Sequence, residues 1–329
     1  MPIASVGSNL GSRVRRAGAW SVFRLLRFCE SYLPTSLLSL LLWFPAAIWD
    51  LFKLRPRRLL LCWHGYPAFL RPKITRFLRH HLSGFSHARL IYSWPDRLSE
   101  ARWLERCCVE GKFDLAELCE GKRGIVFASL HFGPFEAFPY WLRAHGIVTT
   151  MIRGLGPPDS LQSLTRYQYR LSPPDDVPVF LLAQDLTPLP RFAHLRSILG
   201  PGRRMLVMVD ADRGIQVQVP FAERSLRMAA GAIRLAAMAD ADLIPCLIAE
   251  TGPWRFAIHF GEKVPREYLQ HSCDLEPISR HLVREFSKVI AAYPEQCRER
   301  FLSALSSSLD SMCSEEARAQ QDSNLRPTD

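Results

Sequence analysis

Two residues in this sequence have the types and the spacing for acid–base chemistry: His131, and Glu136 five positions later. A neutral imidazole can take a proton from a hydroxyl group, and a nearby carboxylate can fix the tautomer of that imidazole. Together they could activate a hydroxyl toward a thioester. The H-x-x-x-x-E spacing alone is weak evidence, because the composition of the chain gives about one such pair by chance.

A second pair with the same spacing begins at His271, and its context separates it from the first. His271 lies in a polar stretch that begins no helix or strand, which favours a surface position. His131 directly follows residues 124–130, an apolar run entered through glycine and typical of a buried strand. Residues 135–145 then have the apolar spacing of a helix. Because ligands of open α/β sheets bind at the carboxyl ends of strands, His131 stands where a site is expected. A histidine that only caps this turn remains the alternative.

The elements around this turn predict an α/β fold. Strands that alternate with helices favour a central sheet, mostly parallel or mixed, with helices on both of its faces. Buried strands are predicted at residues 124–130, 205–209 and 243–248, and an edge strand at residues 256–260. Helices are predicted at residues 102–120, 135–145, 226–239 and 275–292.

The net charge of the chain is +10, which means attraction to polyanions: nucleic acid, an anionic membrane surface or an acidic carrier protein. The arginines are dispersed, and the sequence has no aromatic–basic stacking motif and no zinc module, so nucleic acid is not an expected partner. The nine cysteines include no C-x-x-C pair. They indicate reduced thiols facing the cytosol, and no metal site is expected.

Residues 1–58 are predicted to form a membrane-associating segment. The apolar block at residues 33–49 is shorter than the roughly 20 apolar residues that a spanning helix needs, and it contains Pro45. It starts too late for a secretory signal. Basic residues flank it on both sides, which favours an interfacial or shallowly inserted segment, although a buried pair of core helices is the alternative. Residues 59–305 would then form the catalytic domain, and residues 306–329 a loose polar tail.

Five segments resemble, in order, the signature segments of one family, the lipid A late acyltransferases. These are the lauroyl and myristoyl transferases of the lysophospholipid acyltransferase superfamily. The resemblance covers roughly residues 105–300. The segments are residues 124–136 (Gly-Ile-Val-Phe-Ala-Ser-Leu-His-Phe-Gly-Pro-Phe-Glu), 150–154 (Thr-Met-Ile-Arg-Gly), 208–214 (Met-Val-Asp-Ala-Asp-Arg-Gly), 219–221 (Val-Pro-Phe) and 293–296 (Tyr-Pro-Glu-Gln).

This resemblance implies an acyltransferase at the cytoplasmic face of the inner membrane. It implies transfer of a fatty acyl group from acyl carrier protein or coenzyme A to a hydroxyl of a lipid A precursor, with no cofactor. His131 would be the general base and Glu136 its partner. Arg153 would bind a headgroup phosphate or stabilise charge on the reacting carbonyl. Asp210 and Asp212 would hold the acceptor side of the cleft. We expect the backbone N–H groups near Phe132 and Gly133, or the Arg153 side chain, to hold the oxyanion.

The chain departs from the family's pattern at several positions, and these leave the acceptor open. Val209 stands where the family has proline, residues 228–230 lack the family's threonines, and Cys297 replaces an aromatic residue. A lysophospholipid, a glycolipid mannoside or an amino-acid lipid are alternative acceptors. The basic charge alone would also fit a non-catalytic protein that binds the membrane surface.

Overall fold

The computed structural model describes residues 62–80, 104–111, 123–154, 179–182, 195–196, 199–200, 202–211, 214–252, 255–270 and 274–305, together with Leu37. Apart from Leu37, the predicted terminal segments at residues 1–58 and 306–329 lie outside this part of the chain, as do Asp212 and His271.

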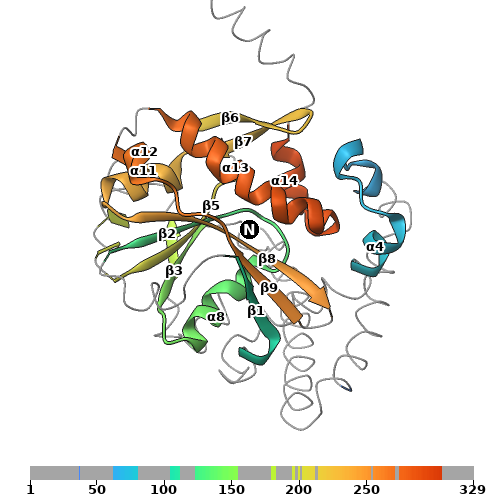
Figure 1. Cartoon of the computed structure of the whole chain (residues 1–329), viewed down its shortest axis with the longest axis horizontal. Helices are drawn as coiled ribbons and strands as arrows, with labels where there is room; N and C mark the ends of the chain where they lie inside the picture. Colours follow the sequence, from blue (N-terminus) through green and yellow to red (C-terminus); the bar gives the residue numbers. More distant parts are fainter. Residues whose placement is uncertain are drawn as a thin grey trace, which may run out of the picture.

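A central sheet organises the fold (Figure 1). Within the described residues it has seven strands in the order β1-β9-β8-β2-β5-β3-β4, and a separate hairpin holds β6 and β7. The sheet strands are β1 (Cys107–Glu110), β2 (Ile125–Ser129), β3 (Thr149–Gly154), β4 (Val179–Leu182), β5 (Arg204–Met208), β8 (Asp242–Gly252) and β9 (Arg255–Phe260), and the hairpin strands are β6 (Gln216–Phe221) and β7 (Arg224–Ala229).

Helices lie between and after the strands. The α-helices are α4 (Ile74–Arg79), α8 (Phe138–Ala144), α11 (Gly231–Met238), α12 (Arg266–Gln270), α13 (Leu275–Ala292) and α14 (Glu299–Ala304), and the short 3-10 helices are η2 (Ala68–Leu70), η4 (Phe135–Ala137) and η5 (Pro294–Gln296).

The sheet is mostly parallel. Strands β8, β2, β5, β3 and β4 pair in parallel, whereas β9 runs antiparallel to β8 and β1 runs parallel to β9. Alternate side chains of the buried strand β2 point to opposite faces. Val126 packs in the apolar cluster that includes Phe286 of α13, and Phe127 packs in the other cluster, with its ring centroid 4.9 Å from that of Phe138 in α8. Figure 1 shows α8 on one side of the sheet and α11 and α13 on the other, so the predicted layering is confirmed.

Two predictions made from local patterns are wrong. Residues 107–110, predicted within a helix, form β1, which pairs with β9 through Cys107 opposite Phe256. Strand β9 therefore lies between β1 and β8 and is not an edge strand. A charged segment has a helix-like local pattern, but the backbone hydrogen bonds offered by a neighbouring strand decided the outcome.

The predicted helix at residues 226–239 begins later than expected. Its first residues belong to β7, in which Leu226 and Met228 are buried and Arg227 is exposed. This alternation is that of a strand, and β7 pairs antiparallel with β6 through Leu226 opposite Val219. The helix itself is α11, which starts at Gly231.

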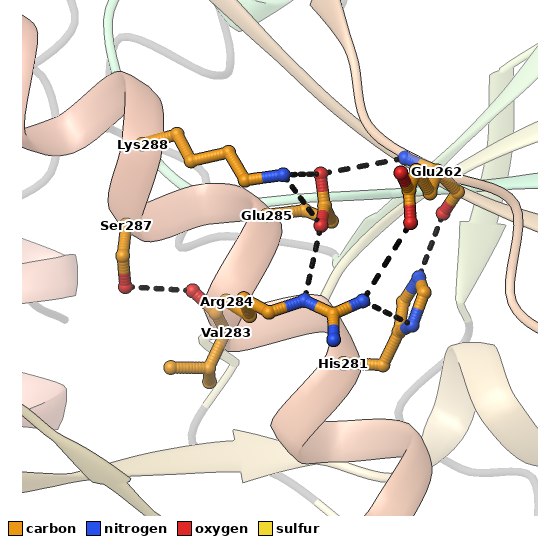
Figure 2. A network of polar contacts seen from close by, with 7 residues as sticks. All are labelled: Glu262, His281, Val283, Arg284, Glu285, Ser287 and Lys288. Carbon is orange, nitrogen blue, oxygen red and sulfur yellow. Dashed lines mark hydrogen bonds and ion pairs between the residues drawn. The ribbon is translucent and has the colours of Figure 1, made fainter.

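Helix α13 forms over the predicted residues and is fixed to the end of β9 by a polar network (Figure 2). The Glu285 carboxylate, 4% exposed, accepts hydrogen bonds from Lys288 Nζ at 2.8 and 2.7 Å and from Arg284 Nε at 3.3 Å. It also accepts from the backbone N–H of Glu262 at 3.4 Å. Burial acts to raise the pKa of Glu285, but these donors outweigh it and hold the pKa below its ordinary value.

The same network includes His281. Its Nε2 donates to the carbonyl oxygen of Glu262 at 2.8 Å, since a carbonyl only accepts, and its Nδ1 then accepts from Arg284 Nη2 at 3.1 Å. Gly261 leaves room for this junction: a Cβ there would lie 2.7 Å from the Cβ of Glu285. The end of β9 and α13 are thus held together by both polar bonds and close packing.

No helix in the described part of the chain is both long and apolar enough to cross a bilayer.

Candidate functional site

His131 and Asp210 stand side by side because of the register of two parallel strands. Ser129, the last residue of β2, is opposite Met208, the last residue of β5. Two residues further along each strand, the Asp210 carboxylate meets His131. Its Oδ1 lies 2.7 Å from the ring Nδ1, and its Oδ2 accepts a hydrogen bond from the backbone N–H of His131 at 2.9 Å.

This geometry fixes which ring nitrogen of His131 carries the proton. An ionised carboxylate can only accept, so Nδ1 donates to Asp210 and Nε2 keeps a lone pair. The side chain of Asp210 is fully buried, whereas that of His131 is 20% exposed. The pair therefore has the geometry of a general base, with Asp210 orienting the ring and Nε2 able to accept a proton.

The residue that binds the ring of His131 is thus one that the sequence analysis assigned to the acceptor side. Asp210 binds Nδ1 and so fixes the tautomer, the function that was expected of Glu136. The backbone of Glu136 lies in η4, and its side chain lies outside the described residues. A usable signal was present in the sequence: His131 and Asp210 each follow a predicted buried strand at the same short distance.

The turn after His131 needs a glycine. Gly133 has φ +46°, and a Cβ there would overlap with the carbonyl oxygen of Ile248 and lie 2.9 Å from Gln296 Oε1. Its N–H donates to the carbonyl oxygen of Gln296 at 2.9 Å. The turn after β2 is therefore packed directly against the backbone of β8.

The N–H groups of Phe132 and Gly133, which were expected to hold an oxyanion, are both bonded within the protein in this arrangement. The N–H of Phe132 donates to the carbonyl oxygen of Leu130 at 2.7 Å, and that of Gly133 is taken by Gln296. The Phe132 side chain is fully buried in the apolar core. Both N–H groups therefore stabilise the turn itself.

Residues 294–298 form the rear wall of this turn, a part that sequence reasoning did not assign to the site. The Gln296 side chain pairs with the backbone of Glu250 in β8: Oε1 accepts from its N–H and Nε2 donates to its carbonyl oxygen, both at 2.8 Å. Cys297 forms an isolated antiparallel bridge with Phe132. The segment thus joins the His131 turn to the sheet.

The segment preceding α4 and α4 itself contact the other side of this rear wall. The Tyr66 hydroxyl donates to the carbonyl oxygen of Cys297 at 3.0 Å, and Arg76 forms an ion pair with Glu295 at 2.9 Å. Burial, followed by the nearby carboxylates of Glu295 and Asp210, raises the pKa of the Cys297 thiol well above its ordinary value. Cys297 therefore stays protonated at neutral pH and offers no thiolate nucleophile.

The structure brings the backbone of Arg153 to the same edge of the sheet. Met151 of β3 is opposite Leu206 of β5, so Arg153, two residues further on, lies near the carboxyl end of β5. Its side chain, like the whole of Asp212, lies outside the described residues. Across the described ranges, no three His, Cys, Asp or Glu side chains are placed to hold a metal ion.

Comparison with known proteins gives one match. The family described as bacterial lipid A biosynthesis acyltransferase matches residues 87–298, more than half of the chain, and that range includes the His131 turn, Asp210 and the segment ending at Arg298. No curated protein matches. The resemblance stated from the sequence segments is confirmed: the chain belongs to the bacterial lipid A biosynthesis acyltransferase family and is an O-acyltransferase.

Proposed function

We propose that this enzyme transfers a fatty acyl group from an acyl thioester to a hydroxyl of a lipid A precursor. The donor is acyl carrier protein or coenzyme A, and no cofactor takes part. The observation that carries the proposal is the His131–Asp210 pair, with Oδ1 2.7 Å from Nδ1, at the carboxyl ends of two adjacent parallel strands. This is a base and its orienting carboxylate where an α/β sheet binds ligands.

His131 acts at its Nε2. This nitrogen takes the proton of the acceptor hydroxyl as the oxygen attacks the thioester carbonyl carbon. The tetrahedral intermediate then collapses, the carbon–sulfur bond breaks, and the thiol leaves with the proton returned by the imidazolium. An ester and a free thiol result, so the proton that His131 removes is the one that it gives back.

Asp210 orients the ring and stabilises the imidazolium that forms between the two steps. The geometry at Nδ1 favours Asp210 over Glu136 for this function. Glu136 remains a proposed site residue, because its backbone lies in η4, the next element after the turn.

Arg153 is the proposed cation of the site. With the N–H groups of Phe132 and Gly133 engaged elsewhere, Arg153 is the remaining candidate from the sequence analysis for the oxyanion or for a headgroup phosphate. Its backbone position at the carboxyl end of β3, next to β5, supports this proposal. Asp212 is proposed to bind the acceptor, since it follows Asp210 by two residues.

Residues 1–58 are proposed to bind the anionic surface of the inner membrane from the cytoplasmic side, where both substrates meet. The net charge of +10 suits this surface and also suits either donor, because acyl carrier protein is acidic and coenzyme A is phosphorylated. Nucleic acid is not a proposed partner.

The test is transfer from a defined donor to a panel of acceptors. The purified enzyme is incubated with an acyl carrier protein thioester and, in parallel, with a lipid A precursor, a lysophospholipid, a mannosylated lipid and an amino-acid lipid. Products are identified by mass spectrometry. Acylated lipid A precursor is the expected product. Product from another acceptor alone would overturn the lipid A assignment and leave the acyltransferase activity in place.

A pair of variants links the activity to the site. His131→Ala should lower turnover by a factor of about 10² to 10⁴, which is what a positioned base contributes. His271→Ala, at the second copy of the same spacing, should leave turnover unchanged. Equal turnover in both variants would contradict the site.

A further inference from the structure

Arg298, the last residue of this rear wall, binds the turn that carries His131 at two backbone carbonyl groups. Its guanidinium donates twice to the carbonyl oxygen of Gly133, from Nε at 3.1 Å and from Nη2 at 2.7 Å. Its backbone N–H donates to the carbonyl oxygen of His131 at 3.3 Å. One residue, distant in sequence, thus fixes the carbonyl groups on both sides of Phe132.

The guanidinium also reaches the imidazole through an aromatic ring. Its central carbon lies 4.4 Å from the centroid of the Phe135 ring, a cation–π distance. The Phe135 ring in turn meets the His131 ring edge to face, with centroids 5.1 Å apart and planes at 78°. Arg298 therefore contacts both the main chain of the turn and, through the Phe135 ring, the imidazole that the turn carries.

We infer that Arg298 is a positioning residue for the base of the proposed acyl transfer, so this inference rests on the proposed function. Asp210 fixes Nδ1 and the N–H of His131, while Arg298 fixes the His131 carbonyl and contacts the ring through Phe135. Together these contacts restrain the turn and the orientation of the ring that it carries. Arg298 itself takes no part in proton transfer.

The contacts explain why arginine suits this position better than lysine. A planar guanidinium can place two donors on one carbonyl oxygen and stack on an aromatic ring at the same time. The ammonium group of lysine keeps the charge but cannot place two donors in this planar arrangement. Moreover, Gln296 and Cys297 already join this segment to β8 and to Phe132, so removing the Arg298 side chain should leave the segment in place.

The first test is kinetic. Arg298→Ala should lower kcat about 10- to 100-fold, the range for losing charge-assisted hydrogen bonds, with KM for donor and acceptor within about twofold of wild type. Arg298→Lys should recover part of the loss. Arg300→Ala, an exposed arginine two residues away on α14, is the matched control and should match wild type. A raised KM with unchanged kcat would mean that Arg298 binds substrate, which would overturn the inference.

The second test asks whether Arg298 acts through His131. In the His131→Ala background, adding Arg298→Ala should lower the residual rate no further, because residues that act as a unit are non-additive. A further tenfold loss would show an independent function and overturn the inference.

The third test needs no activity. Amide hydrogen exchange over residues 131–137 should become at least several-fold faster in Arg298→Ala and stay unchanged in Arg300→Ala, as followed by mass spectrometry. Unchanged exchange in Arg298→Ala would overturn the inference. A wild-type enzyme that transfers no acyl group would contradict the proposed function alone, since the exchange measurement still decides whether Arg298 holds the turn.

Discussion

The carboxylate of Asp210 binds His131 at two points, with one oxygen on the ring Nδ1 at 2.7 Å and the other on the backbone N–H at 2.9 Å. A single bond to the ring would set the tautomer but allow the ring to move with the turn. The second bond ties the same carboxylate to the main chain. Because the Asp210 side chain is fully buried, the surrounding packing restrains the carboxylate in this position.

Asp210→Asn should lower kcat by a factor of about 10² to 10⁴ with the fold retained. The asparagine oxygen can still accept from the backbone N–H, but its NH₂ group then faces Nδ1. The ring must accept there and carry its proton on Nε2, where it can no longer act as a base. Steady-state kinetics with circular dichroism checks this.

Two further variants make that result specific. Asp274→Asn, which changes the cap of α13 at a distance from the site, should leave kcat unchanged. Glu136→Gln should have a smaller effect than Asp210→Asn. If Glu136→Gln lost activity and Asp210→Asn kept it, Glu136 would be the orienting carboxylate.

Gly133→Ala should destabilise the protein more than Gly146→Ala. Both glycines have positive φ, +46° and +72°, so alanine costs about 1 to 2 kcal/mol at either position. At Gly146 a Cβ meets nothing within 4 Å, whereas at Gly133 it overlaps with the Ile248 carbonyl oxygen. Displacing that backbone should cost about 1 to 3 kcal/mol more. Urea unfolding measures the difference, and equal free energies of unfolding would contradict the close contact.

Gln296→Met should cost roughly 2 to 6 kcal/mol of unfolding free energy. The methionine fills the space but leaves the N–H and carbonyl of Glu250 without the two 2.8 Å bonds from the amide, at about 1 to 3 kcal/mol for each buried group. Gln270→Met, at an exposed position of α12, should change stability by less than about 0.5 kcal/mol. If Gln296→Met lost no more unfolding free energy than Gln270→Met, the amide pairing would contribute little to stability.

Glu285→Gln should make the unfolding free energy depend less steeply on pH at acidic pH. The pKa of Glu285 in the folded protein lies below its ordinary value of 4.5, so its contribution is fully present above pH 4.5. That contribution is lost as the pH falls through the lower folded pKa. Unfolding free energies between pH 6 and about pH 3 should therefore fall less steeply in the variant. Glu276→Gln, which breaks an exposed ion pair with Arg280 on the same helix, should leave the slope unchanged, and parallel curves for Glu285→Gln and wild type would contradict the prediction.

Removing residues 1–58 should release the protein from membranes, whereas removing residues 306–329 should not. High salt alone should release little of the full-length protein, because burial of apolar surface, at about 25 cal/mol per Å², is not screened by ions. Flotation with vesicles that contain anionic lipid measures both effects. Complete release of the full-length protein by salt would mean that the contact is purely electrostatic.

The sequence alone predicts those helices and strands that carry a hydrophobic pattern within the segment itself. The run ending at Ser129 is buried over its whole length, and the amphipathic helix at residues 275–292 forms over the predicted residues. Both carry a hydrophobic pattern that favours one structure wherever the segment lies. Strand β1 carries no such pattern: it lies in the charged segment at residues 102–120, and its pairing with β9 makes it a strand.

The partner of His131 depended on strand order, which local patterns do not contain. Asp210 reaches His131 because β5 lies beside β2, although β3 and β4 come between them in the chain. Glu136, close in sequence, was the nearer choice. The pairing of Gln296 with Glu250 has the same cause, since the two residues are 46 positions apart and meet only in the folded sheet.

The separation between Arg298 and Gly133, 165 positions, has a consequence for biosynthesis. A ribosome that adds about 5 to 20 residues per second takes roughly 8 to 33 s to travel from one to the other. During that interval a nascent chain exposes the histidine turn without its rear wall. Premature termination anywhere before residue 298 should therefore release a polypeptide that cannot complete the site.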